Sequence, residues 1–177
     1  MPPDLRQALE REQLGAVLGN PSGDVTLTEF FDYNCPYCRA SVADIHQLIS
    51  EDPQLRIVLR EWPVFGAGSL YCARASLASL RQEKFWPFHA GLMGIKGEAD
   101  DRSALRVAEA AGLDISRLRK DMDNIEIARQ IEHSWLLAEK MGLSGTPTFI
   151  AGDFGAFGKQ SLDQLRSMIA DVRRSRS

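Results

Sequence analysis

Residues Glu29–Cys38 have the sequence EFFDYNCPYC, and this stretch joins a predicted strand to a predicted helix through two cysteines. The strand is predicted over Val25–Phe31, because β-branched and aromatic residues dominate it and the turn formers of 20–24 precede it. The helix is predicted over Ala40–Ser50, whose apolar residues recur on one helical face. A C-x-x-C pair between a strand and a helix is typical of redox chemistry.

The position of each cysteine predicts its role. Cys35 lies where a helix is expected to begin, so unpaired backbone N–H groups and the positive end of the helix dipole favour its thiolate. We therefore expect Cys35 to be the nucleophile. Cys38 is one turn further on, where it can attack a mixed disulfide on Cys35 and act as the resolving thiol. Pro36 fits an early helical position, and together with Tyr37 it forms the dipeptide that helps to set thiolate stability.

A structural zinc half-site and an inert buried pair are two other interpretations of these cysteines. A structural zinc site needs four ligands, usually as two close pairs. The remaining candidates form neither a second C-x-x-C nor an H-x₃₋₅-H pair, and we interpret them as packing or surface residues: Cys72, His46, His89 and His133. Inert thiols fit a helix start poorly. We expect neither a metal nor another cofactor.

The rest of the chain predicts an α/β protein with a helical block inside it. A second strand over Leu55–Trp62 would lie parallel to the first with a right-handed crossover. Strand chemistry returns after Gly142, with a hairpin over 148–157 and a closing helix over Ser161–Val172. Between them we expect only helices, over 71–80, 85–93, 102–111, 116–122 and 127–141.

Composition excludes several classes of protein. The 177 residues suit one domain, and 44% hydrophobic with 25% charged residues is ordinary for a globular chain. The net charge of -3 argues against a nucleic-acid partner, and no apolar run is long enough to cross a membrane. Leu5, Leu9, Val17 and Leu18 predict an amphipathic N-terminal helix over Asp4–Leu18.

The stretch EFFDYNCPYC resembles the active-site segment of the DsbA-like thiol-disulfide oxidoreductases of the thioredoxin superfamily. Gly145–Phe149, with the sequence GTPTF, resembles the cis-proline loop of that family, and the helical block resembles its helical insertion. The resemblance implies a thioredoxin fold with an inserted all-helical subdomain, preceded by a short N-terminal helix. The implied division is an extension over 1–20, a thioredoxin-like domain over 21–66 and 142–177, and the insertion over 67–141.

The same resemblance implies roles for three further residues. Pro147 would follow a cis peptide bond after Thr146 and pack beside Cys35, and the Thr146 backbone would pair with an extended substrate. Glu29 matches a buried acidic residue beneath the family's active site, which suggests a proton relay for Cys38. The alternative for Glu29 is a strand residue facing solvent.

The direction of the chemistry is left open by conflicting signals. The best-known oxidases of the family have Pro-His between the cysteines, whereas this chain has Pro36-Tyr37. Thr146 is more typical of the isomerase branches. We expect a disulfide oxidase, with an isomerase or reductase as the alternative. A chaperone-like binding module would keep its peptide affinity with both cysteines changed to serine, and a glutathione-dependent transferase usually has serine in place of Cys35.

The resemblance also implies partners and a compartment. The expected substrates are unfolded or partly folded proteins, and the expected redox partner is a quinone-linked membrane oxidase or a membrane reductant. Association into a homo-oligomer through the N-terminal helix is an open alternative. The first residues carry no signal-peptide features, so the chain is either cytosolic or a mature form. Because a disulfide donor is useful in the periplasm, we expect a periplasmic protein whose signal peptide is absent from this sequence, with the cytoplasm as the alternative.

Overall fold

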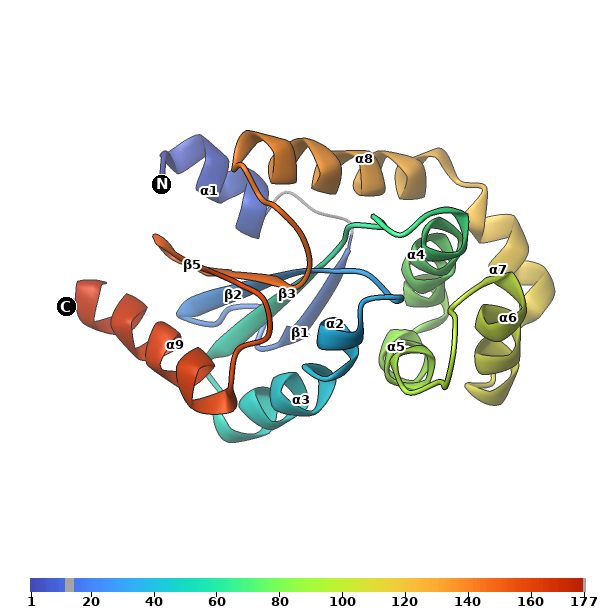
Figure 1. Ribbon diagram of the computed structural model, residues 1–177, viewed down its shortest axis with the longest axis horizontal. Helices are drawn as coiled ribbons and strands as arrows, with labels where there is room; N and C mark the ends of the chain where they lie inside the picture. Colours follow the sequence, from blue (N-terminus) through green and yellow to red (C-terminus); the bar gives the residue numbers. More distant parts are fainter. Residues whose placement is uncertain (12–14, 177) are drawn as a thin grey trace.

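The computed structural model describes residues 1–11 and 15–176 and is built around one mixed sheet (Figure 1). The strand order is β1-β3-β2-β4-β5. The central pair β2 and β3 is parallel, as predicted, and each outer strand is antiparallel to its neighbour. The strands are β1 (Ala16–Gly19), β2 (Val25–Phe31), β3 (Leu55–Glu61), β4 (Thr148–Ala151) and β5 (Phe154–Phe157).

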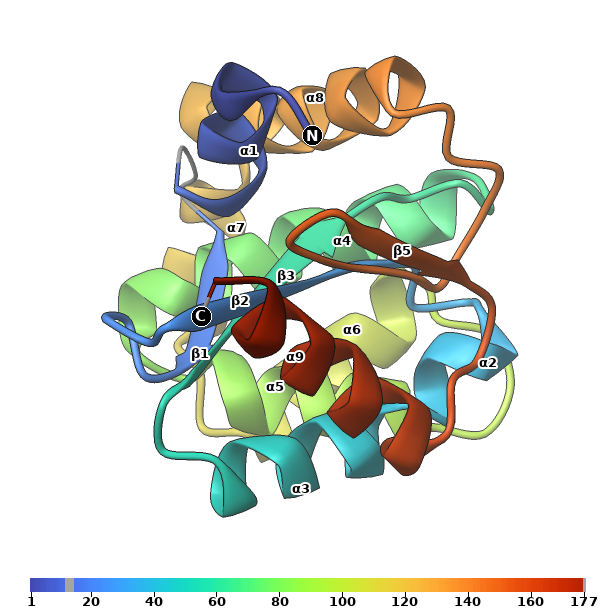
Figure 2. The same ribbon diagram turned by 90° about the vertical axis from the view of Figure 1, so that its left-hand side faces the viewer.

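Helices cover both faces of this sheet. α1 (Pro3–Glu10) and α8 (Ile125–Lys140) lie on one face, and α3 (Val42–Glu51) and α9 (Leu162–Arg176) lie on the other (Figure 2). As a result every residue of β2 and β3 is buried, as is usual for parallel strands inside an α/β fold.

The helical block follows β3 and ends before β4, as the sequence predicts. In addition to α8, the block contains a short 3₁₀ turn (Leu80–Gln82) and four helices: α4 (Ala67–Ser79), α5 (Phe85–Met93), α6 (Asp101–Ala110) and α7 (Ile115–Met122). One apolar cluster runs without a break from the sheet into this block, through residues such as Phe31 and Phe88. The block and the sheet therefore share a core. Within the described residues, none of the helices combines the length and apolarity needed to cross a bilayer.

The predicted N-terminal helix over Asp4–Leu18 is wrong in its second half. The helix ends at Glu10, and β1 pairs antiparallel with β3 in the register Val17 to Val58 and Leu18 to Ile57. Residues 12–14 of the predicted helix lie outside the described residues. The two adjacent apolar residues Val17 and Leu18 are compatible with a helix or a strand. They form a strand because this segment pairs with the otherwise unpaired edge of β3. β1 ends at Gly19, whose φ of +70° and close approach to the Leu55 carbonyl exclude a side chain.

Two buried arginines of β3 hold α1 in place. Arg60 donates from Nη2 to the carbonyl oxygens of Ala8 and Leu9, each at 2.6 Å. Arg56 donates from Nη1 to the carbonyl oxygen of Glu10, also at 2.6 Å. These are carbonyls of the last turn, which have no partner within the helix. Burial lowers the pKa of Arg60 to about 10, and its hydrogen bonds compensate part of that cost.

Candidate active site

The two cysteines lie at the start of a short helix directly after β2. Cys35 is the N-cap of α2 (Pro36–Arg39), and the backbone N–H of Cys38 donates to the Cys35 sulfur at 3.4 Å. Pro36 occupies the first turn, where its missing N–H costs nothing. The helix predicted over 40–50 corresponds to α3, which begins at Val42, and the short α2 precedes it as a separate helix.

The pKa values of the two thiols are shifted in opposite directions. The pKa of Cys35 is lowered to about 6, chiefly by the hydrogen bond with the Cys38 side chain and further by Thr146 and the backbone N–H groups of Cys38 and Tyr37, while burial opposes these effects. The pKa of Cys38 is raised, above all by burial and then by its hydrogen bond to Cys35 and the nearby charge of Glu29. The reduced pair therefore holds one thiolate and one thiol near neutral pH.

A loop from the far end of the chain closes the site. β4 pairs with β2, so the segment that leads into β4 lies beside α2. The peptide bond between Thr146 and Pro147 is cis, and the Cys35 thiol donates to the Thr146 carbonyl oxygen at 3.3 Å. The Thr146 side chain lowers the pKa of Cys35, and its buried hydroxyl has no other hydrogen-bond partner within the described residues. It is thus available as a donor when Cys35 becomes a thiolate.

Glu29 is buried on the face of β2 that carries Leu27 and Phe31. The pKa of its carboxyl is raised to about 8, mainly by burial and then by the charge of Cys35, while Lys159 lowers it. A carboxyl with this pKa exchanges its proton near neutral pH. It also helps to raise the pKa of Cys38.

The other titratable candidates lie apart from this pair. Cys72 is buried, and its thiol donates to the Asp100 carbonyl at 3.6 Å. His89 packs among aromatic rings, His46 stacks on Trp86, and His133 lies against Arg60. Across residues 1–11 and 15–176, no three His, Cys, Asp or Glu side chains are grouped to bind a metal ion.

Sequence reasoning missed two residues that fix the approach to Cys35. The buried carboxylate of Asp32 accepts hydrogen bonds from the backbone N–H groups of Val64 and Phe65 at 2.7 and 3.0 Å. The side-chain amide of Asn34 donates from Nδ2 to the Ala99 carbonyl at 2.9 Å and accepts at Oδ1 from the Ala99 N–H at 2.7 Å. The two side chains join the loop before Cys35 to the loop after β3 and to the helical block. Their only sequence signal is the turn-forming character of Asp and Asn.

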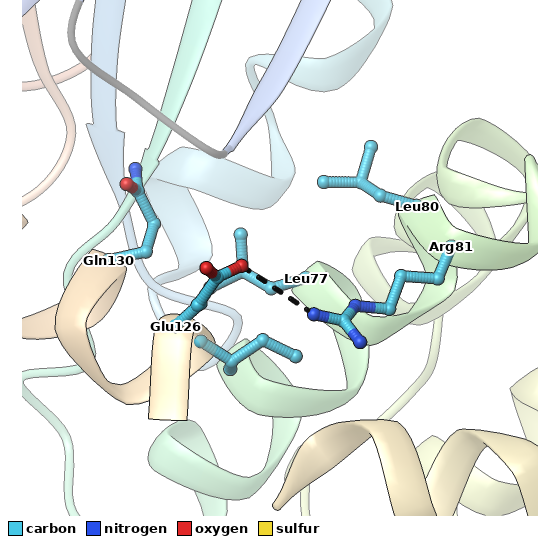
Figure 3. A pocket seen from close by; sticks show the side chains of 6 residues that line it. Leu77, Leu80, Arg81, Glu126 and Gln130 are labelled. Atoms are coloured by element: carbon cyan, nitrogen blue, oxygen red, sulfur yellow. Dashed lines mark ion pairs between the residues drawn. The ribbon is translucent and has the colours of Figure 1, made fainter. Parts of the chain in front are cut away.

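Two hollows differ in their relation to the site. One of about 220 Å³ lies between α4 and α8, where Arg81 and Glu126 form an ion pair at 3.8 Å (Figure 3). None of its lining residues belongs to the elements that carry the cysteines or the cis bond. A groove of about 310 Å³ borders the loop before Pro147 and is lined in part by Met141, Leu143 and Phe157. Phe157 and Tyr37 are 62% and 63% exposed, so apolar side chains are accessible near the cysteines.

Comparison with known proteins points to one family. A sequence model described as the DSBA-like thioredoxin domain matches residues 26–170. The crystal structure of a thioredoxin-like oxidoreductase from Silicibacter pomeroyi is 44% identical, with a TM-score of 0.93 over 96% of this chain and 98% of that one. The thiol-disulfide exchange protein alpha-DsbA2 from Wolbachia pipientis is 29% identical, with a TM-score of 0.88 over 96% and 92% of the two chains.

A different kind of relative is a membrane protein. The Na(+)/H(+) antiporter NhaA 3 of Salinispora tropica is 28% identical over 155 residues, which are 86% of this chain. The match spans only 24% of that antiporter. The similarity therefore concerns one part of the antiporter.

Proposed function

The chain belongs to the family of DsbA-like thioredoxin domains and is a thiol-disulfide oxidoreductase, and on that premise we propose that it donates the Cys35–Cys38 disulfide to substrate proteins. The observation that carries the proposal is the unequal acidity of the two thiols. A stabilised Cys35 thiolate favours the reduced form of the pair, which makes the disulfide an oxidant.

The proposed reaction has two exchange steps. A substrate thiolate attacks the Cys35 sulfur of the disulfide, and the bond to Cys38 breaks. A second substrate thiolate then attacks the substrate sulfur of the mixed disulfide and releases Cys35 as a thiolate. The substrate dithiol loses two electrons and becomes a disulfide, and the cysteine pair gains them as one thiolate and one thiol.

Glu29 is the proposed source of the proton that Cys38 takes up. Both groups are buried, and burial disfavours a Cys38 thiolate. When the disulfide opens, Glu29 gives its proton to Cys38, and it takes the proton back when the disulfide re-forms. Its pKa of about 8 supports transfer in either direction near neutral pH.

We propose that Thr146, Pro147 and the neighbouring groove bind unfolded or partly folded substrates. The Thr146 backbone lies against the Cys35 sulfur, where an extended chain that pairs with it would present a cysteine. Methionine and phenylalanine side chains of the groove suit varied apolar sequences, because thioethers adapt their shape.

The proposed setting is the periplasm, where disulfides persist. A quinone-linked membrane oxidase would re-form the Cys35–Cys38 disulfide after each turnover. Association through the N-terminal helix is the proposed route to a homo-oligomer. In the structure α1 already buries Leu9 against its own chain. Light scattering of the chain with and without residues 1–10 tests this route.

A reductase or isomerase is the second candidate, favoured by Tyr37. This side chain is 63% exposed and places no imidazole beside the Cys35 thiolate. The couple would then be less oxidising, and a membrane reductant would keep it reduced.

The deciding experiment is the equilibrium of the Cys35–Cys38 pair with glutathione, followed by thiol trapping. A potential well above the roughly -270 mV of thioredoxin supports the oxidase, and a potential at or below it supports the reductase or isomerase. Oxidation of a reduced, unfolded substrate with Cys35→Ser as control tests turnover. Peptide binding that persists in the Cys35→Ser, Cys38→Ser double variant without any exchange by the wild type would instead support a binding module.

A further inference from the structure

A chain of four buried side chains runs from β3 to α5. Ser76 Oγ donates to Glu61 Oε1 at 2.6 Å, and the Tyr33 hydroxyl donates to Ser76 Oγ at 2.7 Å. The same Tyr33 hydroxyl lies 2.9 Å from His89 Nδ1. All four residues are buried, and they come from four different segments of the chain.

The hydrogen bonds between these four side chains all point the same way, from His89 toward Glu61. Ser76 and Tyr33 each carry a single hydroxyl proton. Ser76 donates its proton to Glu61, and Tyr33 donates its proton to Ser76. The Tyr33 oxygen must therefore accept a proton from His89 Nδ1–H. If Glu61 carries the proton instead, every bond can reverse, and His89 Nδ1 becomes the final acceptor. Such a chain can pass a proton along its length while its heavy atoms stay in place.

The Glu61 end of this hydrogen-bonded series lies beside Glu29. Phe31 pairs with Glu61, and Glu29 pairs with Leu59 on the two parallel strands. Side chains two residues apart on a strand share a face, so Glu29 and Glu61 lie diagonally on the same face of these two strands. Burial raises the pKa of Glu61, and the charges of Asp32 and Glu29 raise it further, while the bond from Ser76 lowers it.

The other end is His89 of α5, which is 3% exposed, and neither of its ring nitrogens is among the fully buried atoms that have no hydrogen-bond partner within the described residues. His89 is stacked on Phe85 at 5.1 Å between ring centroids, and it lies 5.8 Å from Trp86. Trp86 in turn stacks on the exposed His46 of α3. Burial lowers the pKa of His89 to about 3, so its imidazole is neutral and can hold its proton on either nitrogen.

We propose that His89, Tyr33, Ser76 and Glu61 form a proton path between solvent at α5 and the buried Glu29. This inference rests on the proposed relay from Glu29 to Cys38. After Glu29 protonates Cys38, Glu61 gives its proton to Glu29. Ser76 then protonates Glu61, Tyr33 protonates Ser76, and His89 protonates Tyr33 from Nδ1 while it takes a solvent proton at Nε2. One solvent proton thus replaces the one that Cys38 received.

Rotation of the two hydroxyls and exchange of the imidazole tautomer return the path to its first direction. Oxidation of the pair sends one proton outward by the same route. The path acts on rate alone, because an equilibrium is independent of the route by which protons arrive.

The test removes one hydroxyl from the path in each of two variants. Tyr33→Phe and Ser76→Ala each break the path, and Ser79→Ala is the matched control. Ser79 is equally buried on α4, and its hydroxyl donates to the Ser76 carbonyl outside the path. Stopped-flow Trp fluorescence measures the rate at which the Cys35–Cys38 disulfide is reduced by dithiothreitol in H₂O and D₂O. Glutathione equilibria give the reduction potential of each variant.

We expect Tyr33→Phe and Ser76→Ala to slow reduction by about tenfold or more, as loss of proton transfer does. Their reduction potential and the Cys35 pKa should match the wild type, which a general structural disturbance would not allow. Equal rates in wild type and both variants, or an equal loss in Ser79→Ala, would overturn the path. If the wild type itself forms no Cys35–Cys38 disulfide, the proposed function fails instead.

Discussion

The Cys35 sulfur lies 3.3 Å from the carbonyl oxygen of Thr146, a residue 111 positions later in the chain. Thr146 also brings a buried hydroxyl that lowers the pKa of Cys35 and has no other partner within the described residues. The carbonyl accepts a hydrogen bond from the thiol, whereas the hydroxyl can donate one to the thiolate. One residue therefore interacts with both protonation states of the nucleophile, and the balance between its two groups helps to set the acidity of Cys35.

Thr146→Val should raise the pKa of Cys35 by about one to two units, because a hydrogen bond to a charged group contributes about 1.5–3 kcal/mol. The carbonyl contact is kept, so only the thiolate loses a partner. The pair should become less oxidising as the thiolate loses stabilisation. Absorbance of the thiolate at varied pH measures the first effect, and glutathione equilibria measure the second. Thr146→Ser retains the hydroxyl and should match the wild type; equal values in all three proteins would exclude this role.

Alkylation of the reduced protein should show a single reactive thiol with a midpoint near pH 6, the pKa of Cys35. The largest contribution to that value is the hydrogen bond with Cys38. Cys38→Ala should therefore move the midpoint toward the ordinary thiol value of 9.0, whereas Cys38→Ser keeps a donor and should move it less. Mass spectrometry of the alkylated peptides identifies the residue. A midpoint unaffected by either change would contradict the proposed source of the acidity.

Glu29 should make the folded protein less stable as pH rises. Its folded pKa of about 8 lies above the ordinary value of 4.5, so the unfolded chain holds fewer protons between these values. The contribution of Glu29 is fully present below pH 4.5 and is lost as pH rises toward 8. Relative to Glu29→Gln, the wild type should lose about 1.4 kcal/mol per pH unit in this window. Urea unfolding of the reduced proteins measures the difference, because the charge of Cys35 contributes to this pKa. Parallel pH profiles would show that folding does not raise the pKa of Glu29.

Arg60→Met should lower the free energy of unfolding by about 2–4 kcal/mol, because two last-turn carbonyls of α1 lose a charged donor. The methionine retains most of the apolar stem. Arg6→Met is the control, since Arg6 bonds to the exposed Asp153 and its loss should cost about 1 kcal/mol or less. Urea denaturation gives both values. Limited proteolysis should also cut Arg60→Met near α1 sooner than the control, and equal losses in the two variants would refute the anchoring role.

The sequence was sufficient for the central elements and insufficient for buried charge. Val25–Phe31 is predictable from its β-branched and aromatic residues and the helical block from its periodicity, and the cysteine pair marks the junction between strand and helix. The helix predicted at Val17 and Leu18 is wrong because two apolar neighbours suit a strand or a helix, and pairing with β3 makes this segment a strand. Arg60 and Glu61 stand in an apolar strand, but their partners on α1 and α4 are distant in sequence. Their burial depends on tertiary structure.

The order of segments along the chain has a consequence for synthesis. Helices α4–α8 separate the cysteines from the loop at Thr146, so a ribosome makes both thiols well before it makes their carbonyl partner. A nascent chain that ends before β4 also leaves β2 without its antiparallel neighbour. The contact between Cys35 and Thr146 can therefore form only after the 110 residues between them have been made. A truncated product would carry the two cysteines without the environment that distinguishes them.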